Sequence, residues 1–320
     1  MNKIFYGNCL DVLKKLKAQS VNMCVTSPPY FNLRDYDHDD QIGLEKTPQQ
    51  YVEQLVKVFM SIHRVLKDDG TLWINIGDSY ARQGGAAKKS RHWDGRDKDV
   101  NMCNAIQAKD IGLAPKNLIG VPWRLAFALQ DAGWILRQDL IWHKPNPMPE
   151  SVQDRFTKSH EYLFLFAKSE QYYFDVEAVR EKAISNSTGT AAGFKRTNSK
   201  REHAIFGQQN GTHRPDRKET PVSEFRNKRS VWTVATKPYK GAHTAVFPTA
   251  LIEPCIRAGS RENDVVLDPF MGSGTTAAVA ICNNRQFVGI ELNPDYKPLI
   301  DKRIREAKAF AKAINQPKYF

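Results

Sequence analysis

The stretch "DVVLDPFMGSGTTAAVAICNNRQFVGIELNPDY", residues 264–296, decides the fold. It reads as an apolar strand, a glycine-rich turn, a helix and a second apolar strand. In the turn, Gly272 and Gly274 let the backbone come close to a ligand, and the start of the helix offers free N–H groups. Such a unit is typical of a parallel sheet that binds a ligand beyond the carboxyl end of its first strand.

The position of Glu291, at the end of the second strand, predicts the kind of ligand. Glu291 follows Gly272 by 19 residues, close to the ~20 typical of an acidic residue that binds ribose hydroxyls. The alternative is a carboxylate that caps the turn starting at Asn293. Ala277 stands where a dinucleotide-binding turn has its third glycine, so the turn alone also fits a nicotinamide or flavin enzyme. A Walker loop is excluded because no Gly-Lys-Ser/Thr sequence follows.

Outward from this unit, helices and apolar strands alternate along the chain. The first predicted elements are a strand at 21–25, a helix from Thr47 that ends before Gly70, and a strand in "TLWINIGDSY". A helix at 122–131 and a strand through Leu140 and Trp142 follow. Next come a strand or hairpin in which 162–167 pairs with 172–174, and a closing helix at 295–313. This alternation indicates an α/β fold whose mostly parallel sheet includes an antiparallel strand or hairpin.

The charge of the chain indicates a polyanionic partner. The 320 residues carry a net charge of +12, which is typical of proteins that bind a polyanion, although basic proteins without such a partner are common. Residues 180–230 hold 12 Lys and Arg against 5 Asp and Glu, and residues 81–117 hold 8 against 4. Both segments interrupt the helix and strand pattern, so they read as basic insertions or recognition loops.

Cysteine use and hydropathy narrow the class of protein. The five cysteines form no CxxC pair, so neither a disulfide framework nor a metal site is expected. The sequence contains no signal segment, and no apolar run approaches the ~18 residues of a membrane span. These features predict a cytoplasmic protein without membrane contact.

A proline corner, "TSPPY" at residues 26–30, follows the first predicted strand. Pro28 and Pro29 donate no backbone hydrogen bond and fix φ, so the corner holds Ser27 and Tyr30 rigidly. Taken alone, the corner also fits a rigid turn between strand and loop with a packed tyrosine.

Together, "TSPPY" and the later "DPFMGSGTT" and "GIELNP" resemble the β class of amino-group DNA methyltransferases, in which the catalytic motif precedes the target-recognition region and the cofactor motif comes last. The resemblance extends from "GNCLDVL" through "WHKPNPMPES" and "HEYLFLFAK" to "FPTALIEPCIRAGS". It implies a Rossmann-like class I methyltransferase sheet, mostly parallel, with helices on both faces and a circularly permuted motif order. Residues 1–179 would form the catalytic half with its insertion at 81–117, residues 180–230 the target-recognition insertion, and residues 231–320 the cofactor-binding half.

The resemblance also implies roles for individual residues. The catalytic motif comprises Ser27, Pro28, Pro29 and Tyr30. The residues implied in binding S-adenosyl-L-methionine are Asn8, Asp268, Phe270, Gly272, Ser273, Gly274, Thr275, Glu291 and Asn293. Asn8 stands where the family usually has an acid. Asp78 either supports the site or caps a strand, and His243 and Phe247 either line the cofactor pocket or only pack.

The chemistry of an exocyclic amine explains the proline corner. The lone pair of such an amine is delocalised into the ring, and hydrogen bonds accepted from its N–H groups favour a pyramidal, more nucleophilic nitrogen. The Ser27 side chain and the Pro28 carbonyl are the expected acceptors, and Tyr30 would stack on the flipped base. Direct transfer needs no cysteine nucleophile, so Cys255, which follows Pro254 as in cytosine-C5 enzymes, is expected to be a buried structural thiol.

The target base and the partners follow from the same resemblance. "TSPPYFNLRDYD" is most similar to the cytosine-N4 group, with adenine-N6 as the alternative. An RNA methyltransferase and a catalytically silent DNA-binding protein remain further alternatives. The expected partner is double-stranded DNA, and a homodimer and a cognate restriction endonuclease are also implied.

Overall fold

A computed structural model describes residues 2–36, 38–83, 107–183, 224–236 and 247–314. The chain divides into two compact units, one formed by Met1–Ala178 with Arg229–Phe320 and the other by Val179–Lys228. His243 and most of the two basic segments lie outside the described residues. Within the described ranges, no helix has the length and apolar composition needed to cross a membrane.

The first unit is built on a sheet that has eight strands within the described residues. In sheet order these are β1 (Lys3–Tyr6), β10 (Gln286–Glu291), β9 (Val265–Asp268), β2 (Val21–Thr26), β3 (Leu66–Ile76), β5 (His160–Ala167), β4 (Ile135–His143) and β8 (Val231–Thr233). Neighbouring strands run parallel, except that β5 is antiparallel to both β3 and β4. The predicted mostly parallel sheet with an antiparallel strand is therefore confirmed.

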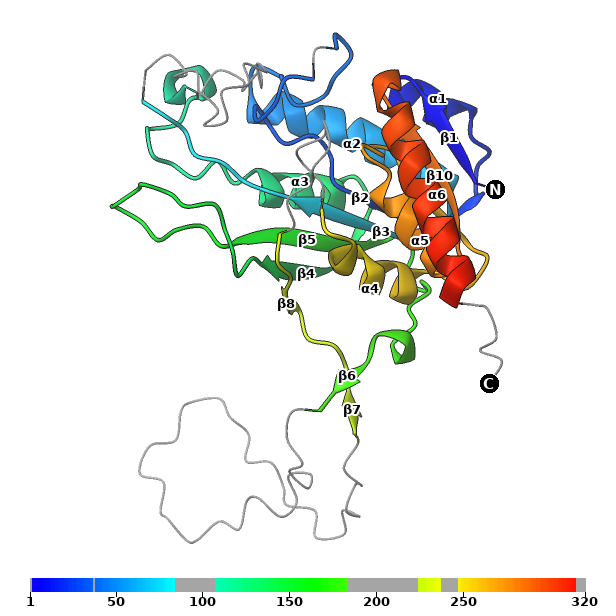
Figure 1. Ribbon diagram of the computed structural model, residues 1–320. Helices are drawn as coiled ribbons and strands as arrows, with labels where there is room; N and C mark the ends of the chain where they lie inside the picture. Colours follow the sequence, from blue (N-terminus) through cyan, green and yellow to red (C-terminus); the bar gives the residue numbers. More distant parts are fainter. Residues whose placement is uncertain (1, 37, 84–106, 184–223, 237–246, 315–320) are drawn as a thin grey trace, which may run out of the picture. The chain divides into compact units, whose positions relative to one another are not determined.

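Six helices of the described chain cover this sheet in two rows. They are α1 (Cys9–Lys15), α2 (Pro48–Val65), α3 (Val121–Asp131), α4 (Thr249–Gly259), α5 (Thr275–Cys282) and α6 (Lys297–Ile314). The first three pack side by side, and so do the last three. Figure 1 shows the two rows on opposite faces of the sheet. The main core lies under α1, α2 and α3, where their apolar faces meet the sheet.

The predicted helix from Thr47 begins as expected but ends earlier. The Thr47 hydroxyl accepts a hydrogen bond from the Gln50 N–H at 3.2 Å, and Pro48 occupies the first turn. The helix ends at Val65 because Leu66 already has an extended backbone and begins β3. Gly70 lies inside β3, where the pairing with β2 shifts register and a side chain would meet backbone oxygens at about 3 Å. Glycine therefore marks a bulge here and not a helix end.

The predicted pairing of 162–167 with 172–174 is wrong. β5 is flanked on one side by β3 and on the other by β4, the strand that precedes it. Residues 172–174 form no strand; the Tyr173 N–H instead donates to the Asp69 carbonyl at 2.9 Å. Both edges of β5 are occupied by longer strands, so no edge remains for a local partner. The closing helix α6 starts two residues later than predicted, after a short 3-10 turn at Pro294–Tyr296.

The strand order brings distant motifs together. β2 pairs with β9 through Met23 with Val266 and Cys24 with Leu267, although these strands are far apart in sequence. Parallel strands end at the same edge of a sheet, so the proline corner after β2 and the glycine-rich turn after β9 are neighbours.

The second unit contains a short ladder within its described residues. Here β6 (Glu181–Lys182) and β7 (Phe225–Arg226) pair antiparallel. The Arg226 guanidinium and the Glu181 carboxylate form an ion pair at 2.8 Å across this ladder.

Candidate active site

Asp268, at the end of β9, ties the two motifs to each other. Its carboxylate accepts hydrogen bonds from the hydroxyls of Thr26 and Thr276, both at 2.6 Å, and from the Phe270 N–H at 3.0 Å. The side chain is buried, and burial raises its pKa, while the three hydrogen bonds act in the opposite direction. Asp268 thus joins the end of β2, the glycine-rich turn and the start of α5.

A cavity of about 1040 Å³ opens at this edge of the sheet. Its volume suits a nucleoside-sized ligand together with a second, planar one. The predicted site residues in its wall are Asn8, Ser27, Pro28, Pro29, Tyr30, Phe270, Gly272, Ser273, Thr275, Glu291 and Asn293. Asp268 and Gly274 do not line it. Gly274 instead precedes α5 with a φ of 84°, and a Cβ at this position would lie 3.3 Å from Cγ2 of Ile300 in α6.

Glu291 provides a buried carboxylate in the cavity wall. It accepts hydrogen bonds from the N–H groups of Gly272 at 2.7 Å and Asn293 at 2.9 Å, one on each oxygen. Burial raises the pKa of Glu291 to about 7 against the effect of these bonds. Each carboxylate oxygen keeps a second acceptor position, which suits a ligand with two neighbouring hydroxyls. The capping role and the binding role of Glu291 are therefore compatible.

Asn8 lines the cofactor side of the cavity, and Arg303 holds the glycine-rich turn that borders it. The Asn8 side-chain oxygen caps α1 by accepting from the Leu10 N–H at 2.9 Å. Arg303, from α6, donates to the Ser273 hydroxyl at 2.7 Å and also contacts the Thr275 hydroxyl. No local sequence pattern predicts this role of Arg303, because only the packing of α6 on α5 brings it to the turn.

Hydrogen bonds from neighbouring parts of the chain hold the backbone of the proline corner in place. Tyr51, a buried residue of α2, donates a hydrogen bond to the Pro29 carbonyl at 2.7 Å. The Asn32 N–H donates to the Gly43 carbonyl at 2.6 Å. These contacts fix the backbone within the corner and just after it, so the neighbouring Ser27 is presented by a rigid support.

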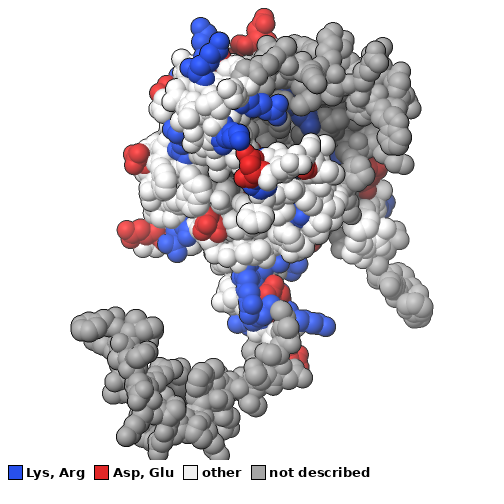
Figure 2. Space-filling model, turned by 90° about the vertical axis from the view of Figure 1, so that its left-hand side faces the viewer, with Lys and Arg blue, Asp and Glu red and all other residues white. Residues whose placement is uncertain are grey.

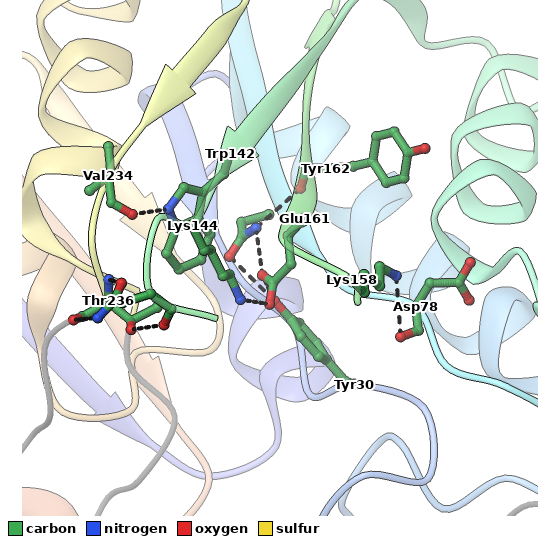
Figure 3. Close-up of polar contacts among 11 residues, drawn as sticks. Tyr30, Asp78, Trp142, Lys144, Lys158, Glu161, Tyr162, Val234 and Thr236 are labelled. Atoms are coloured by element: carbon green, nitrogen blue, oxygen red, sulfur yellow. Dashed lines mark hydrogen bonds and ion pairs between the residues drawn. The ribbon is translucent and has the colours of Figure 1, made fainter. Parts of the chain in front are cut away.

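Tyr30 is fixed at both its ring and its hydroxyl (Figure 3). A side chain on Gly77 would place its Cβ 2.6 Å from the Tyr30 ring, so the glycine makes room for it. The Tyr30 hydroxyl donates to Glu161 Oε2 at 2.6 Å, and Asn75 Oδ1 lies 3.3 Å away. Burial, followed by the nearby Glu161 charge, raises the pKa of the phenol well above its usual value. Tyr30 is therefore a neutral hydrogen-bond donor.

Two further residues of the cavity wall, Lys144 and Glu161, form an ion pair that was not predicted from the sequence. Their side chains are only 18% and 15% exposed, and the Lys144 ammonium lies 4.3 Å from the Trp142 ring centre. Lys144 follows β4, and Glu161 is the second residue of the antiparallel β5. A correct pairing of "LIWHK" with "HEYLF" would have brought both residues to the edge where β2 ends.

Asp78 caps a helix. Its carboxylate accepts from the N–H groups of Gly120 and Val121 at 3.1 Å, at the start of α3. Lys158 donates to the Asp78 carbonyl at 3.4 Å, and burial lowers the pKa of this lysine. Phe247 lines the cavity, and Cys255 is fully buried in α4.

Comparison with known proteins identifies the family. A family model described as DNA methylase matches residues 21–302. The type II methyltransferase M.Cfr9I of Citrobacter freundii is 47% identical over 305 residues, which cover 94% of this chain and 87% of that protein. The type II methyltransferase M.SmaI of Serratia marcescens is 44% identical, with coverage of 94% and 90%.

Solved structures share the fold. PvuII DNA methyltransferase, described as cytosine-N4-specific, superposes with a TM-score of 0.61 at 17% identity, covering 98% of this chain and 92% of that one. A putative DNA modification methylase of Thermus thermophilus, complexed with S-adenosyl-L-methionine, gives 0.58 at 21% identity, with coverage of 100% and 96%. With the family match over most of the sequence, the chain belongs to the DNA methylases of the N6/N4 family.

Proposed function

We propose that this protein methylates the exocyclic N4 amine of cytosine at a specific sequence in duplex DNA, after flipping the base out of the helix. Its cofactor is S-adenosyl-L-methionine. The observation that carries the proposal is that one cavity is lined both by the Ser27 and Pro28 corner and by the glycine-rich turn with Glu291. A methyl donor and an acceptor amine held there would face each other.

The cofactor side of the cavity fits S-adenosyl-L-methionine. Glu291 offers acceptor positions for the two ribose hydroxyls, and Gly272 lets the backbone approach the ligand. When bound, the cofactor supplies a methyl group on a sulfonium, an activated electrophile. The protein therefore has to orient the acceptor and exclude water, and it needs no covalent intermediate.

The proline corner would make the amine nitrogen more nucleophilic. We assign the Ser27 hydroxyl and the Pro28 carbonyl as acceptors for the two amine hydrogens, which leaves the nitrogen lone pair available to attack. As the new nitrogen–carbon bond formed, the bond between sulfur and the methyl carbon would break with its electron pair left on sulfur, and the methylated amine would release a proton to solvent. The Tyr30 ring stacks on the flipped base.

The choice of cytosine-N4 over adenine-N6 rests on sequence similarity. The Ser27-Pro28-Pro29-Tyr30 motif is the form typical of cytosine-N4 enzymes, and a neighbour in fold is described as cytosine-N4-specific. Both bases offer an aromatic amine that Ser27 can accept from, so the acceptors alone fit either base.

We also propose that DNA is bound by the basic segments. Residues 180–230 would read the target sequence, with residues 81–117 as a second basic contact to phosphates. On the face drawn in Figure 2, Lys and Arg side chains, with a few Asp and Glu, border a hollow in the surface. We further propose that the protein works in the cytoplasm, together with a cognate restriction endonuclease, and that it assembles as a homodimer.

The deciding experiment is mass spectrometry of nucleosides from DNA incubated with purified protein and S-adenosyl-L-methionine. We expect N4-methyldeoxycytidine, and a Ser27→Ala variant should form it at least about tenfold more slowly. N6-methyldeoxyadenosine would overturn the assignment of the base. Absence of both products, with methylation of RNA in a parallel reaction, would overturn DNA as the substrate.

A further inference from the structure

We propose that Phe156 enters the base stack of the DNA and fills the gap that the flipped target base leaves. A base that leaves the duplex exposes the faces of its neighbours, and apolar side chains such as phenylalanine can insert between base steps. The inference rests on the proposed function, because it requires a base that leaves the helix. It gives Phe156 a part in base flipping and none in methyl transfer.

Phe156 lies in the loop that joins β4 to β5, residues 144–159. Because β5 is antiparallel to both β3 and β4, β4 runs in the same direction as β3 and ends at the same edge of the sheet. The loop therefore leaves the sheet at the edge where the cavity opens, and Figure 1 shows it extending beyond the ends of the strands. Loop residues in the cavity wall include Met148, Glu150 and Lys158.

The two most exposed large apolar side chains of the described residues lie in this loop. Phe156 is 96% exposed and Met148 is 86% exposed, whereas the next, Ile314, is 64% exposed. A single exposed apolar side chain is ordinary on a protein surface. Two such side chains in one loop beside a ligand cavity indicate a surface that becomes buried in a complex.

Hydrogen bonds within the loop hold the backbone on both sides of Phe156. Arg155 Nη1 donates to Glu150 Oε2 at 2.7 Å, and the Lys158 N–H donates to the same oxygen at 3.2 Å. The Arg155 guanidinium also lies 4.0 Å from the ring centre of Tyr80, and the loop contains three prolines, which fix φ. Phe156 is therefore presented to solvent by an ordered support, which lowers the entropy lost on binding.

The charges around Phe156 suit a DNA backbone. The two acids of the loop, Glu150 and Asp154, are both in ion pairs with basic residues. Lys158 lies in the cavity wall, and burial lowers its pKa, so a phosphate beside it would stabilise its charged form. Duplex DNA offers this combination, because its base faces are apolar and lie between two lines of phosphates. DNA is accordingly the partner that fits this surface.

Phe156→Ala tests the inference. A side chain that is 96% exposed packs against little in the free protein, so the melting temperature and the affinity for S-adenosyl-L-methionine should stay at their wild-type values. With a matched duplex we expect kcat to fall about tenfold, because loss of the stacked ring favours the base that remains in the helix. Phe156→Leu still fills part of the gap and should lose less.

A mismatch at the target position separates base flipping from methyl transfer. A cytosine opposite adenine leaves the stack at a lower cost than a paired cytosine. On this duplex, kcat of Phe156→Ala should return to within about twofold of wild type. Wild-type kcat of the variant on the matched duplex would overturn the inference, and so would an equal loss on both duplexes.

Phe310→Ala is the matched control. Phe310 is 59% exposed near the end of α6, and its replacement should change kcat on neither duplex. If Phe156 instead contacts a second copy of the chain, Phe156→Ala will lower the molar mass measured by light scattering without DNA. That result would overturn the inference.

A binding measurement gives a readout without turnover. A duplex with an abasic site at the target position has the gap but no base to flip. Wild-type protein should bind it about tenfold more tightly than Phe156→Ala does. Equal affinities would overturn the inference, whatever the methylation assay shows. The proposed function fails separately, if wild-type protein yields no methylated cytosine.

Discussion

At the scale of single residues, Gly77 makes room for Tyr30. Its Cβ would lie 2.6 Å from Tyr30 Cε2 and 3.1 Å from Cδ2. We expect Gly77→Ala to displace the ring, to destabilise the protein by about 1–3 kcal/mol and to lower kcat while cofactor affinity is kept. Thermal unfolding and steady-state kinetics would measure both effects. In a Tyr30→Ala background the added methyl meets no ring, so an equal loss of stability there would contradict the steric explanation.

Glu291 predicts a pH dependence of stability. Its folded-state pKa of about 7 lies above the usual 4.5, so the folded protein binds the proton more tightly than the unfolded chain. The resulting stabilisation is complete below about pH 4.5 and is lost as the pH rises through 7, by about 1–3 kcal/mol in total. Urea unfolding of wild type and Glu291→Gln across this range should show the difference. Parallel curves for the two proteins would refute it.

At the scale of elements, Asp268 joins β2 to α5. It is buried and accepts three hydrogen bonds, two of them from threonine hydroxyls at 2.6 Å. Asp268→Ala should leave these buried donors without a partner and cost about 2–4 kcal/mol. Differential scanning calorimetry measures the loss, with the exposed Asp11→Ala as the control. A melting temperature equal to that of the control would rule out this joining role.

The elements also show which parts of the fold can be predicted from the sequence. Strands and helices with apolar periodicity, such as the units at β2 and β9, were predictable because burial and chain direction leave a local pattern. The pairing of β5 with β4 was not, because aromatic residues at 172–174 have local strand propensity while the actual partner is fixed by the whole sheet. The same error hid Lys144 and Glu161. The motif residues could be predicted. The residues that contact them and hold them in position could not, because these contacts depend on the register between distant strands.

At the scale of the whole molecule, the positive charge predicts a salt-dependent affinity for DNA. Residues 180–230 hold 12 Lys and Arg, four of them in "KRTNSKR" at 195–201. Replacing these four by Gln should weaken duplex binding and reduce the slope of log K against log salt by up to about four. Cofactor affinity should not change. Fluorescence anisotropy at several salt concentrations measures the slope, and an unaltered slope would exclude phosphate contacts by these residues.

The β6–β7 ladder has an evolutionary consequence. The chain enters and leaves the second unit through paired strands, with Glu181 opposite Arg226 and Lys182 opposite Phe225, so the ends of the intervening stretch stay fixed whatever its sequence. If this stretch reads the target sequence, as proposed, it can be exchanged without altering the cavity, and the target sequence and the chemistry can then change independently. Grafting the matching stretch of a relative should redirect methylation to the donor's sequence at unchanged cofactor affinity, as sequencing of the methylated DNA would reveal. If the grafted protein still methylates the original target sequence, the residues that read this sequence lie elsewhere in the chain.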